Sequence, residues 1–409
     1  MQFTVLFVDD EPNMIEGLKR MLRSMRDEWG VYFALSGREA LDVMAKNQID
    51  VVVSDMRMPE MDGAELLSEV RHLYPHTIRV ILSGVSDQEL VLNSVRTAHQ
   101  FLSKPCNAET LKYTLDRLFR LRYLINNERL ETLVAGTELL PSIPDIYMKL
   151  LQELNSPDVS FKRVGDIISR DVSMAAKVLQ LVNSAFFGIP QKVSNPHQAV
   201  TLLGLNLIRS LALCVKIFSI HEEHGKQEVL VDAIWRHSLK VSALAKEIAV
   251  VESADQETVE DSFVAGLLHD MGKLLLLKNP NHHQQVLNLM KEKDCRYFEA
   301  ELALLGASHA EVGAYLLGLW ALPDNIVGAV AYHHMPWKSI GDKFTELTAV
   351  HIANALLDRE TFEGTEKEKL PEYPNLDRGY LNKIKLKSSF QELAHIALQA
   401  RYQQVLPKR

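Results

Sequence analysis

The chain has 409 residues, of which 47% are hydrophobic and 24% charged. This length is too great for one ordinary core and predicts two or three globular domains. The net charge of −8 provides no general attraction for nucleic acid, and three scattered cysteines exclude a disulfide framework. There is no signal-peptide pattern and no apolar run of about 18 residues, so we expect a cytoplasmic protein outside the membrane.

The first part of the chain, residues 1–122, alternates short apolar runs with amphipathic stretches. The apolar runs have the length and composition of buried strands and cover residues 5–8, 31–35, 51–53, 78–82 and 100–102. The stretches between them show the spacing of helices. This alternation predicts an α/β fold, a doubly wound five-stranded parallel sheet with helices on both faces.

Polar side chains follow most of the predicted strands. They are Asp9 and Asp10 after the first strand, Asp55 after the third, Ser83 after the fourth, and Lys104 with Pro105 after the fifth. The carboxyl ends of parallel strands converge on one cleft, where three carboxylates would repel one another without a cation. Oxygen ligands suit Mg²⁺, and a carboxylate beside Mg²⁺ can attack a phosphorus atom. The pattern therefore predicts a phosphoryl-accepting site.

These residues, in this order, resemble the response-regulator receiver domain, a flavodoxin-like domain, over residues 1–122. The resemblance implies that Asp55 is the phospho-acceptor. It also implies that Asp9, Asp10 and Asp55 bind Mg²⁺ together with the backbone carbonyl of Arg57. A sensor histidine kinase or a phosphotransfer protein would then supply the phosphoryl group.

The same resemblance assigns four further residues. It implies that Ser83 and Phe101 are the switch pair. It implies that Lys104, which precedes Pro105, binds the phosphate, as expected of a cation that neutralises phosphoryl oxygens.

Beyond the fifth strand the pattern becomes helical. We expect a helical linker over 123–138, an all-α domain over 139–356, and a C-terminal extension of a loop and helices over 357–409. Within the all-α domain, the strings 181–188 and 199–204 resemble the HDOD domain, an HD-related module of bacterial signalling proteins. This resemblance implies an HD-like helical fold with a regulatory, non-catalytic role.

Six side chains with metal-ligating groups are spread over four predicted helices. They are His237, His269, Asp270, His309, His333 and His334. Imidazole and carboxylate groups suit Mn²⁺, Fe²⁺ or Zn²⁺. The set resembles the HD superfamily of metal-dependent phosphohydrolases, which implies metal binding by these residues and a phosphate contact from Lys273. His282 and His283 fall in a polar stretch that we expect to be a loop without a role.

Two departures from that superfamily bear on catalysis. Asn354 stands where its last carboxylate is expected, and Met335-Pro336-Trp337 follows the histidine pair instead of the Gly-Tyr-Pro of cyclic-di-GMP phosphodiesterases. We therefore favour a phosphorylation-dependent response regulator whose non-catalytic helical domain contacts a downstream signalling protein, with homodimerisation left open.

The alternative is a phosphorylation-gated, metal-dependent phosphohydrolase of cyclic-di-GMP or another cyclic nucleotide. A DNA-binding output is disfavoured, because no basic recognition helix closes the chain.

Overall fold

The computed structural model describes ten segments and seven single residues. The segments are 3–23, 29–83, 97–104, 106–124, 145–154, 158–169, 195–205, 228–277, 281–357 and 375–396, and the single residues are 156, 174, 178, 193, 208, 279 and 373. The chain divides into two compact units, residues 1–149 with 315–321 and residues 150–314 with 322–409. We call the first the α/β domain and the second the helical domain.

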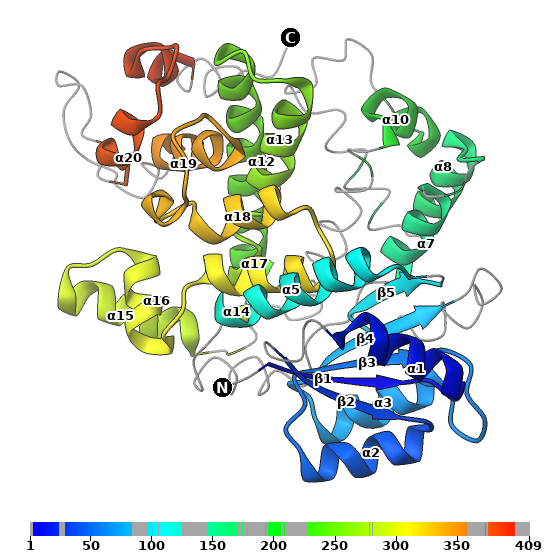
Figure 1. Ribbon diagram of the computed structural model, residues 1–409. Coiled ribbons are helices and arrows are strands. Elements are labelled where there is room, and N and C mark those ends of the chain that lie inside the picture. Colours follow the sequence, from blue (N-terminus) through cyan, green and yellow to red (C-terminus); the bar gives the residue numbers. More distant parts are fainter. Residues whose placement is uncertain are drawn as a thin grey trace. The chain divides into compact units, whose positions relative to one another are not determined.

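The α/β domain is built on a parallel sheet with the strand order β2-β1-β3-β4-β5 (Figure 1). The strands are β1 (Phe3–Val8), β2 (Trp29–Ala34), β3 (Val51–Asp55), β4 (Ile78–Ser83) and β5 (Gln100–Ser103). This confirms the predicted doubly wound, five-stranded sheet. The register pairs Val8 with Ser54 and Asp55 with Leu82, so the carboxyl ends of the central strands lie level. Ligand sites in such sheets lie at this edge, where the strand order reverses.

Helices cover the sheet of the α/β domain. They are α1 (Pro12–Met21), α2 (Gly37–Lys46), α3 (Gly63–Leu73) and α5 (Ala108–Leu124). All five residues of β3 are buried, as expected of a central strand covered on both faces. Phe119 of α5 packs edge-on against Phe3 of β1, with ring centroids 5.0 Å apart.

The start of α3 fixes the loop that follows β3. The Asp62 carboxylate accepts from the backbone N–H of Glu65, and the Glu65 carboxylate accepts from the N–H of Asp62, which forms a capping box. At Gly63 a Cβ atom would overlap the carbonyl oxygen of Asp55. Only glycine lets the helix backbone approach the end of β3 so closely.

The helical domain and the segment leading into it contain no strand among the described residues, as the sequence predicted. The helices are α7 (Asp145–Leu154), α8 (Phe161–Ser169), α10 (Pro196–Leu203), α12 (Glu228–Val251), α13 (Gln256–Leu268), α14 (Met271–Leu276), α15 (His282–Lys293), α16 (Tyr297–Leu305), α17 (His309–Leu319), α18 (Asp324–Tyr332), the 3₁₀ turn η5 (Pro336–Lys338), α19 (Glu346–Leu357) and α20 (Arg378–Lys383). The string 181–188 and most of the expected linker lie outside the described residues.

Four helices form the centre of the helical domain: α12, α13, α18 and α19. All residues of α19 are buried, because this helix is surrounded by neighbours. Two glycines bring helix backbones together, Gly266 against α12 and Gly272 against the carbonyl oxygen of His309 at the start of α17. Among the described helices, none is by itself long and apolar enough to cross a membrane, and α16 with α17 passes that test only as a pair bent by 74°.

Candidate functional site

The first candidate site is an acidic pocket at the carboxyl ends of β1, β3 and β5. Asp9 and Asp55 are both buried there, and Asp10 is half-buried. The ammonium of Lys104, just after β5, lies 2.9 Å from Oδ2 of Asp9 and 2.5 Å from Oδ1 of Asp55. The structure thus brings together residues up to 95 positions apart in the sequence, as the strand-end argument predicted.

Backbone hydrogen bonds hold the two buried carboxylates of this pocket in place. The N–H of Glu11 donates to Oδ1 of Asp9 (3.0 Å), and the N–H of Arg57 donates to Oδ2 of Asp55 (3.2 Å). Burial lowers the pKa of Lys104, but its hydrogen bonds to Asp55 and Asp9 raise that pKa more, so the net shift is upward. Lys104 therefore stays charged at neutral pH.

The donor set of the acidic pocket suits Mg²⁺. The carboxylates of Asp9, Asp10 and Asp55 outnumber the Lys104 ammonium, so two negative charges remain for a divalent cation. All donors are hard oxygen ligands, and the half-buried position of Asp10 leaves room for the waters that Mg²⁺ retains. The residues present therefore fit a magnesium ion.

The predicted switch residues lie on neighbouring strands. Ser83 ends β4 and is half-buried, and Phe101 in β5 is half-buried opposite Ile81. The backbone N–H of Lys104 donates to the carbonyl of Ser83 (2.7 Å), which ties the end of β5 to the end of β4. Pro105 lies outside the described residues.

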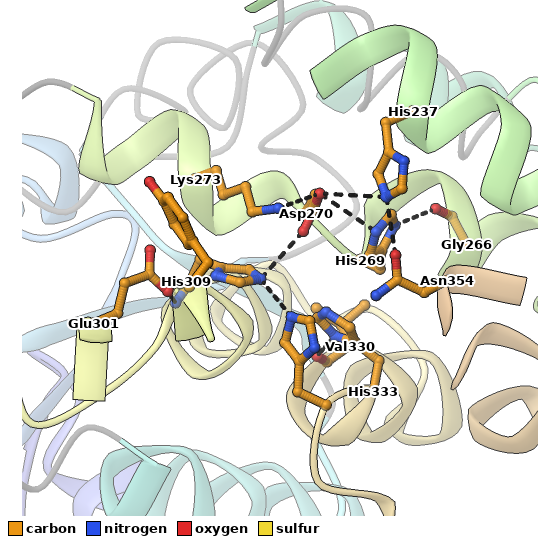
Figure 2. Close-up of polar contacts among 12 residues, drawn as sticks. His237, Gly266, His269, Asp270, Lys273, Glu301, His309, Val330, His333 and Asn354 are labelled. Atoms are coloured by element: carbon orange, nitrogen blue, oxygen red, sulfur yellow. Dashed lines mark hydrogen bonds and ion pairs between the residues drawn. The ribbon is translucent and has the colours of Figure 1, made fainter. Parts of the chain in front are cut away.

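The second candidate site is a cluster of histidines around Asp270, which we call the histidine cluster (Figure 2). Its members are the six residues expected from the sequence: His237, His269, Asp270, His309, His333 and His334. They come from α12, the α13–α14 turn, the first residue of α17 and the end of α18. Oδ1 of Asp270 lies 3.2 Å from Nε2 of His309, and Oδ2 lies 3.4 Å from Nε2 of His269. Nε2 of His334 lies 3.0 Å from Nε2 of His309.

Three imidazoles of the cluster are fixed in one tautomer. Nδ1 of His269 donates to the carbonyl of Gly266 (2.7 Å), and Nδ1 of His333 donates to the carbonyl of Val330 (2.8 Å). Nδ1 of His309 faces Oε2 of Glu301 at 2.5 Å. Because carbonyls and carboxylates only accept, each Nδ1 carries a hydrogen, and in the neutral ring each Nε2 carries a lone pair. Nε2 of His269 and of His333 finds no hydrogen-bond partner among the described residues.

Burial dominates the protonation of the cluster. It lowers the pKa of His269 to about 4 and, with neighbouring imidazoles, lowers the pKa of His333 and His334 well below the usual value. For His309 burial also lowers the pKa, but the charge of Glu301 together with the hydrogen bonds to Asp270 and Glu301 raises the pKa overall. Burial raises the pKa of Asp270, whereas the neighbouring imidazoles and Lys273 lower it well below its usual value.

His237 differs from the other histidines of the cluster. Its Nε2 lies 2.9 Å from Oδ1 of Asn354 in α19 and 3.9 Å from Oδ2 of Asp270. An amide oxygen only accepts, so this Nε2 carries a hydrogen and has no lone pair for a metal. The departure at Asn354 therefore closes the His237 side of the site. In the second departure from the superfamily, the tripeptide Met335-Pro336-Trp337, the side chain of Trp337 in η5 is 51% exposed.

The sequence did not indicate that two further residues, Glu301 and His282, belong to the surroundings of the histidine cluster. Glu301 in α16 is fully buried and accepts from the backbone N–H of His309 (2.9 Å) as well as facing its ring. Burial raises the pKa of Glu301, but His309 and His282 lower it to about 2. His282 is buried at the start of α15 with Nε2 3.5 Å from Oε1 of Glu301, so the expectation of a loop at this position was wrong.

Lys273, for which the resemblance implied a phosphate contact, pairs with a carboxylate of the histidine cluster. Its ammonium pairs with Oδ2 of Asp270 at 2.7 Å, so a phosphate would have to draw it away from that carboxylate.

The residues of the histidine cluster fit one transition-metal ion. His309, His333 and His334 have ligand atoms within 4.8 Å of one another, and so do His237, His269 and Asp270. In His269, His309 and His333 an oxygen acceptor holds Nδ1, so Nε2 of the neutral ring can ligate, as in metal-ligating histidines, whereas Nε2 of His237 donates to Asn354 and cannot. A second ion bridged by a carboxylate fits less well, because Asn354 offers a neutral amide that His237 already engages.

Comparison with known protein families agrees with this architecture. Residues 5–116 match the response regulator receiver domain, and residues 140–336 match the HDOD domain. The two matches define the class: this is a signal-transduction protein of the response-regulator type. Its helical part belongs to the HDOD family.

Individual relatives are similar over parts of the chain. An uncharacterized protein of Treponema pallidum is 25% identical over 199 residues, 48% of this chain and 37% of its own length. The hydrogenase transcriptional regulatory protein HoxA of Cupriavidus necator is 31% identical over 163 residues, 39% of this chain and 32% of its own length. The chain thus spans about a third of the length of these curated relatives.

A solved structure is similar over a larger share of the chain. It is an HDOD domain protein with unknown function from Geobacter sulfurreducens, 26% identical, with a TM-score of 0.50 over 71% of this chain and 99% of that one.

Proposed function

We propose that this protein is a phosphorylation-dependent response regulator in which Asp55 accepts the phosphoryl group and the HDOD domain is a non-catalytic output. The observation that carries the proposal is the contact of Lys104 with both Asp9 and Asp55 at the ends of three strands. The donor would be a sensor histidine kinase or a phosphotransfer protein in the cytoplasm. The recipient of the signal would be a downstream signalling protein that binds the helical domain.

The proposed transfer forms a bond between a carboxylate oxygen of Asp55 and phosphorus. The bond from phosphorus to the donor's imidazole nitrogen breaks, and that nitrogen keeps the electron pair. Asp9, Asp10, Asp55 and the Arg57 carbonyl would hold Mg²⁺, which would neutralise charge on the phosphoryl oxygens. Lys104 stays charged and lies close enough to pair with one of those oxygens.

The test is labelling of the purified chain with acetyl phosphate and Mg²⁺. We expect acid-labile phosphate on the wild type and a loss of at least about 100-fold in Asp55→Asn, which keeps the shape but removes the nucleophile. Asp42→Asn on the exposed face of α2 is the matched control and should label normally. Undiminished labelling of Asp55→Asn would rule out this acceptor.

We further propose that phosphorylation changes the α/β domain through Ser83 and Phe101, and that α5 carries the change toward the HDOD domain. Both switch residues are half-buried on β4 and β5, so they have freedom to move. A phosphoryl group shifts such an equilibrium only by stabilising one state more than the other. Solution scattering and hydrogen exchange with and without beryllofluoride test this, and identical exchange over 97–124 would contradict it.

The non-catalytic output rests on the bond between His237 and Asn354. A site that clamps two metal ions for hydrolysis needs a bridging negative charge, which the amide lacks. We expect weak binding of a single metal and negligible hydrolysis of cyclic-di-GMP by the wild type. Metal analysis and a phosphodiesterase assay with Mn²⁺ and Fe²⁺ test this. Asp270→Ala should abolish the residual metal, and Asn354→Asp should increase it. Fast hydrolysis by the wild type would instead establish a phosphohydrolase.

A further inference from the structure

The carboxylate of Asp270 already has a cation beside it. The Lys273 ammonium lies 2.7 Å from Oδ2, closer than Nε2 of His269 at 3.4 Å or Nε2 of His237 at 3.9 Å. The Asp270 side chain is only 2% exposed, so little water screens this pair. The ammonium therefore lies at Oδ2, the oxygen atom that would have to bind a metal ion held jointly by Asp270 and His269.

The backbone and an aromatic ring keep Lys273 in this position. Asp270 immediately precedes α14 and Lys273 lies three residues further on, so both side chains share one face of the first turn. Gly272 between them lets the backbone of α14 approach the His309 carbonyl closely. The ammonium also lies 5.5 Å from the centroid of the Tyr297 ring, within cation–π range.

We infer that Lys273 is a built-in counter-cation of the histidine cluster: it occupies the cation position at Asp270 and must leave before a metal ion can bind there. An ammonium and a divalent ion on the same carboxylate oxygen would repel each other strongly in a buried site. The charge of the Asp270 carboxylate is then balanced by a side chain of the same turn. This rests on the proposed non-catalytic output and replaces the phosphate contact expected for Lys273 from the sequence.

The test compares Co²⁺ binding by full-length variants in excess Mg²⁺, which keeps the acidic pocket filled. Lys273→Met keeps most of the apolar stem and removes the charge. It should bind Co²⁺ about tenfold tighter or more, the effect expected for one opposite charge beside a carboxylate. Lys273→Arg retains the charge and should bind weakly, and Lys291→Met on the exposed face of α15 should match the wild type. The visible absorption of bound Co²⁺ reports imidazole ligation. Equal or weaker binding by Lys273→Met would overturn the inference.

A second measurement uses the wild type and so does not depend on the folding of a variant. The Lys273 side chain is 26% exposed, within reach of an amine-acylating reagent. Saturation with Co²⁺ should increase its acylation at least about twofold while Lys291 is unchanged, because the metal displaces the ammonium from Asp270. Constant acylation of Lys273 at full metal occupancy would contradict displacement. Phosphorylation of Asp55 enters neither experiment, so failure here leaves the receiver part of the proposal standing.

Discussion

In the acidic pocket two buried carboxylates share one lysine at the edge of a sheet, whereas in the histidine cluster two buried carboxylates lie among a lysine and several imidazoles. Asp9 and Asp55 both form ion pairs with Lys104, and Asp10 next to Asp9 in the sequence is half-buried. Asp270 pairs with Lys273, and Glu301 with His309. The first arrangement leaves negative charge for a ligand to neutralise, and the second leaves little. The two regions therefore differ in how much charge they leave for a bound cation.

In both regions a glycine lets a helix approach the site closely. Replacing that glycine by alanine should have the largest effect on stability of the changes considered. At Gly63 it would overlap the Asp55 carbonyl, and at Gly272 the His309 carbonyl. We expect Gly63→Ala and Gly272→Ala to lower the stability of their own domain by about 3 kcal/mol or more. Gly17→Ala and Gly328→Ala meet no atom within 4 Å and should be neutral or stabilising by up to about 1 kcal/mol. Calorimetry checks this, and four equal shifts would contradict it.

Acid should weaken the histidine cluster of the metal-free protein. The folded pKa of His269 is about 4, below the unfolded value of 6.5, so the folded state binds fewer protons in this range. Its contribution is present at neutral pH and is lost as the pH falls from about 6.5 toward about 4, by about 3 kcal/mol at most. His333 acts in the same direction. Denaturant unfolding across this range should show the loss, and His269→Gln should flatten the pH profile.

Glu301, the buried carboxylate that pairs with His309, allows a test of whether the two charges stabilise each other. Glu301→Gln keeps an acceptor for Nδ1 but removes the charge, so the helical domain should lose about 2 kcal/mol. The pKa of His309, measured by NMR, should fall, because the Glu301 charge is the largest of the interactions that raise it against the effect of burial. Glu292→Gln on the exposed side of α15 is the control and should change neither quantity. An unchanged His309 pKa would show that the pair is not coupled.

The smallest expected effect is that of Mg²⁺, which should raise the stability of one domain and not of the other. At ten times its dissociation constant, Mg²⁺ should stabilise the α/β domain by about 1.4 kcal/mol. It should leave the helical domain unchanged, because imidazole nitrogens are poor ligands for so hard an ion. Asp10→Asn should reduce the stabilisation and Asp42→Asn should not. If Mg²⁺ shifted both transitions equally, the contrast between the sites would fail.

The sheet and the acidic pocket could be predicted because local signals determine them. Each strand is a short apolar run, and the site residues come directly after the runs, so parallel pairing alone brings Asp9, Asp55 and Lys104 together. The helical fold and the six members of the histidine cluster followed from helix patterns and from a family resemblance.

The partners inside the histidine cluster could not be predicted. Glu301 is a single carboxylate in a helical stretch, which usually indicates a solvent-facing position, and its burial depends on His309 eight residues later. The bond between His237 and Asn354 joins residues 117 positions apart, and no spacing rule reports it. Such choices are made by tertiary packing after the helices have formed.

The exposure of Trp337 gives the helical domain an optical reporter. The chain has four tryptophans, and the other three, Trp29, Trp235 and Trp320, are at most 4% exposed. Trp337 is 51% exposed and follows His334 by only three residues. A soluble quencher such as iodide should therefore act mainly on this indole, and the remaining emission would come from the buried rings. Fluorescence can thus follow events at the histidine pair in the unmodified protein, without a label.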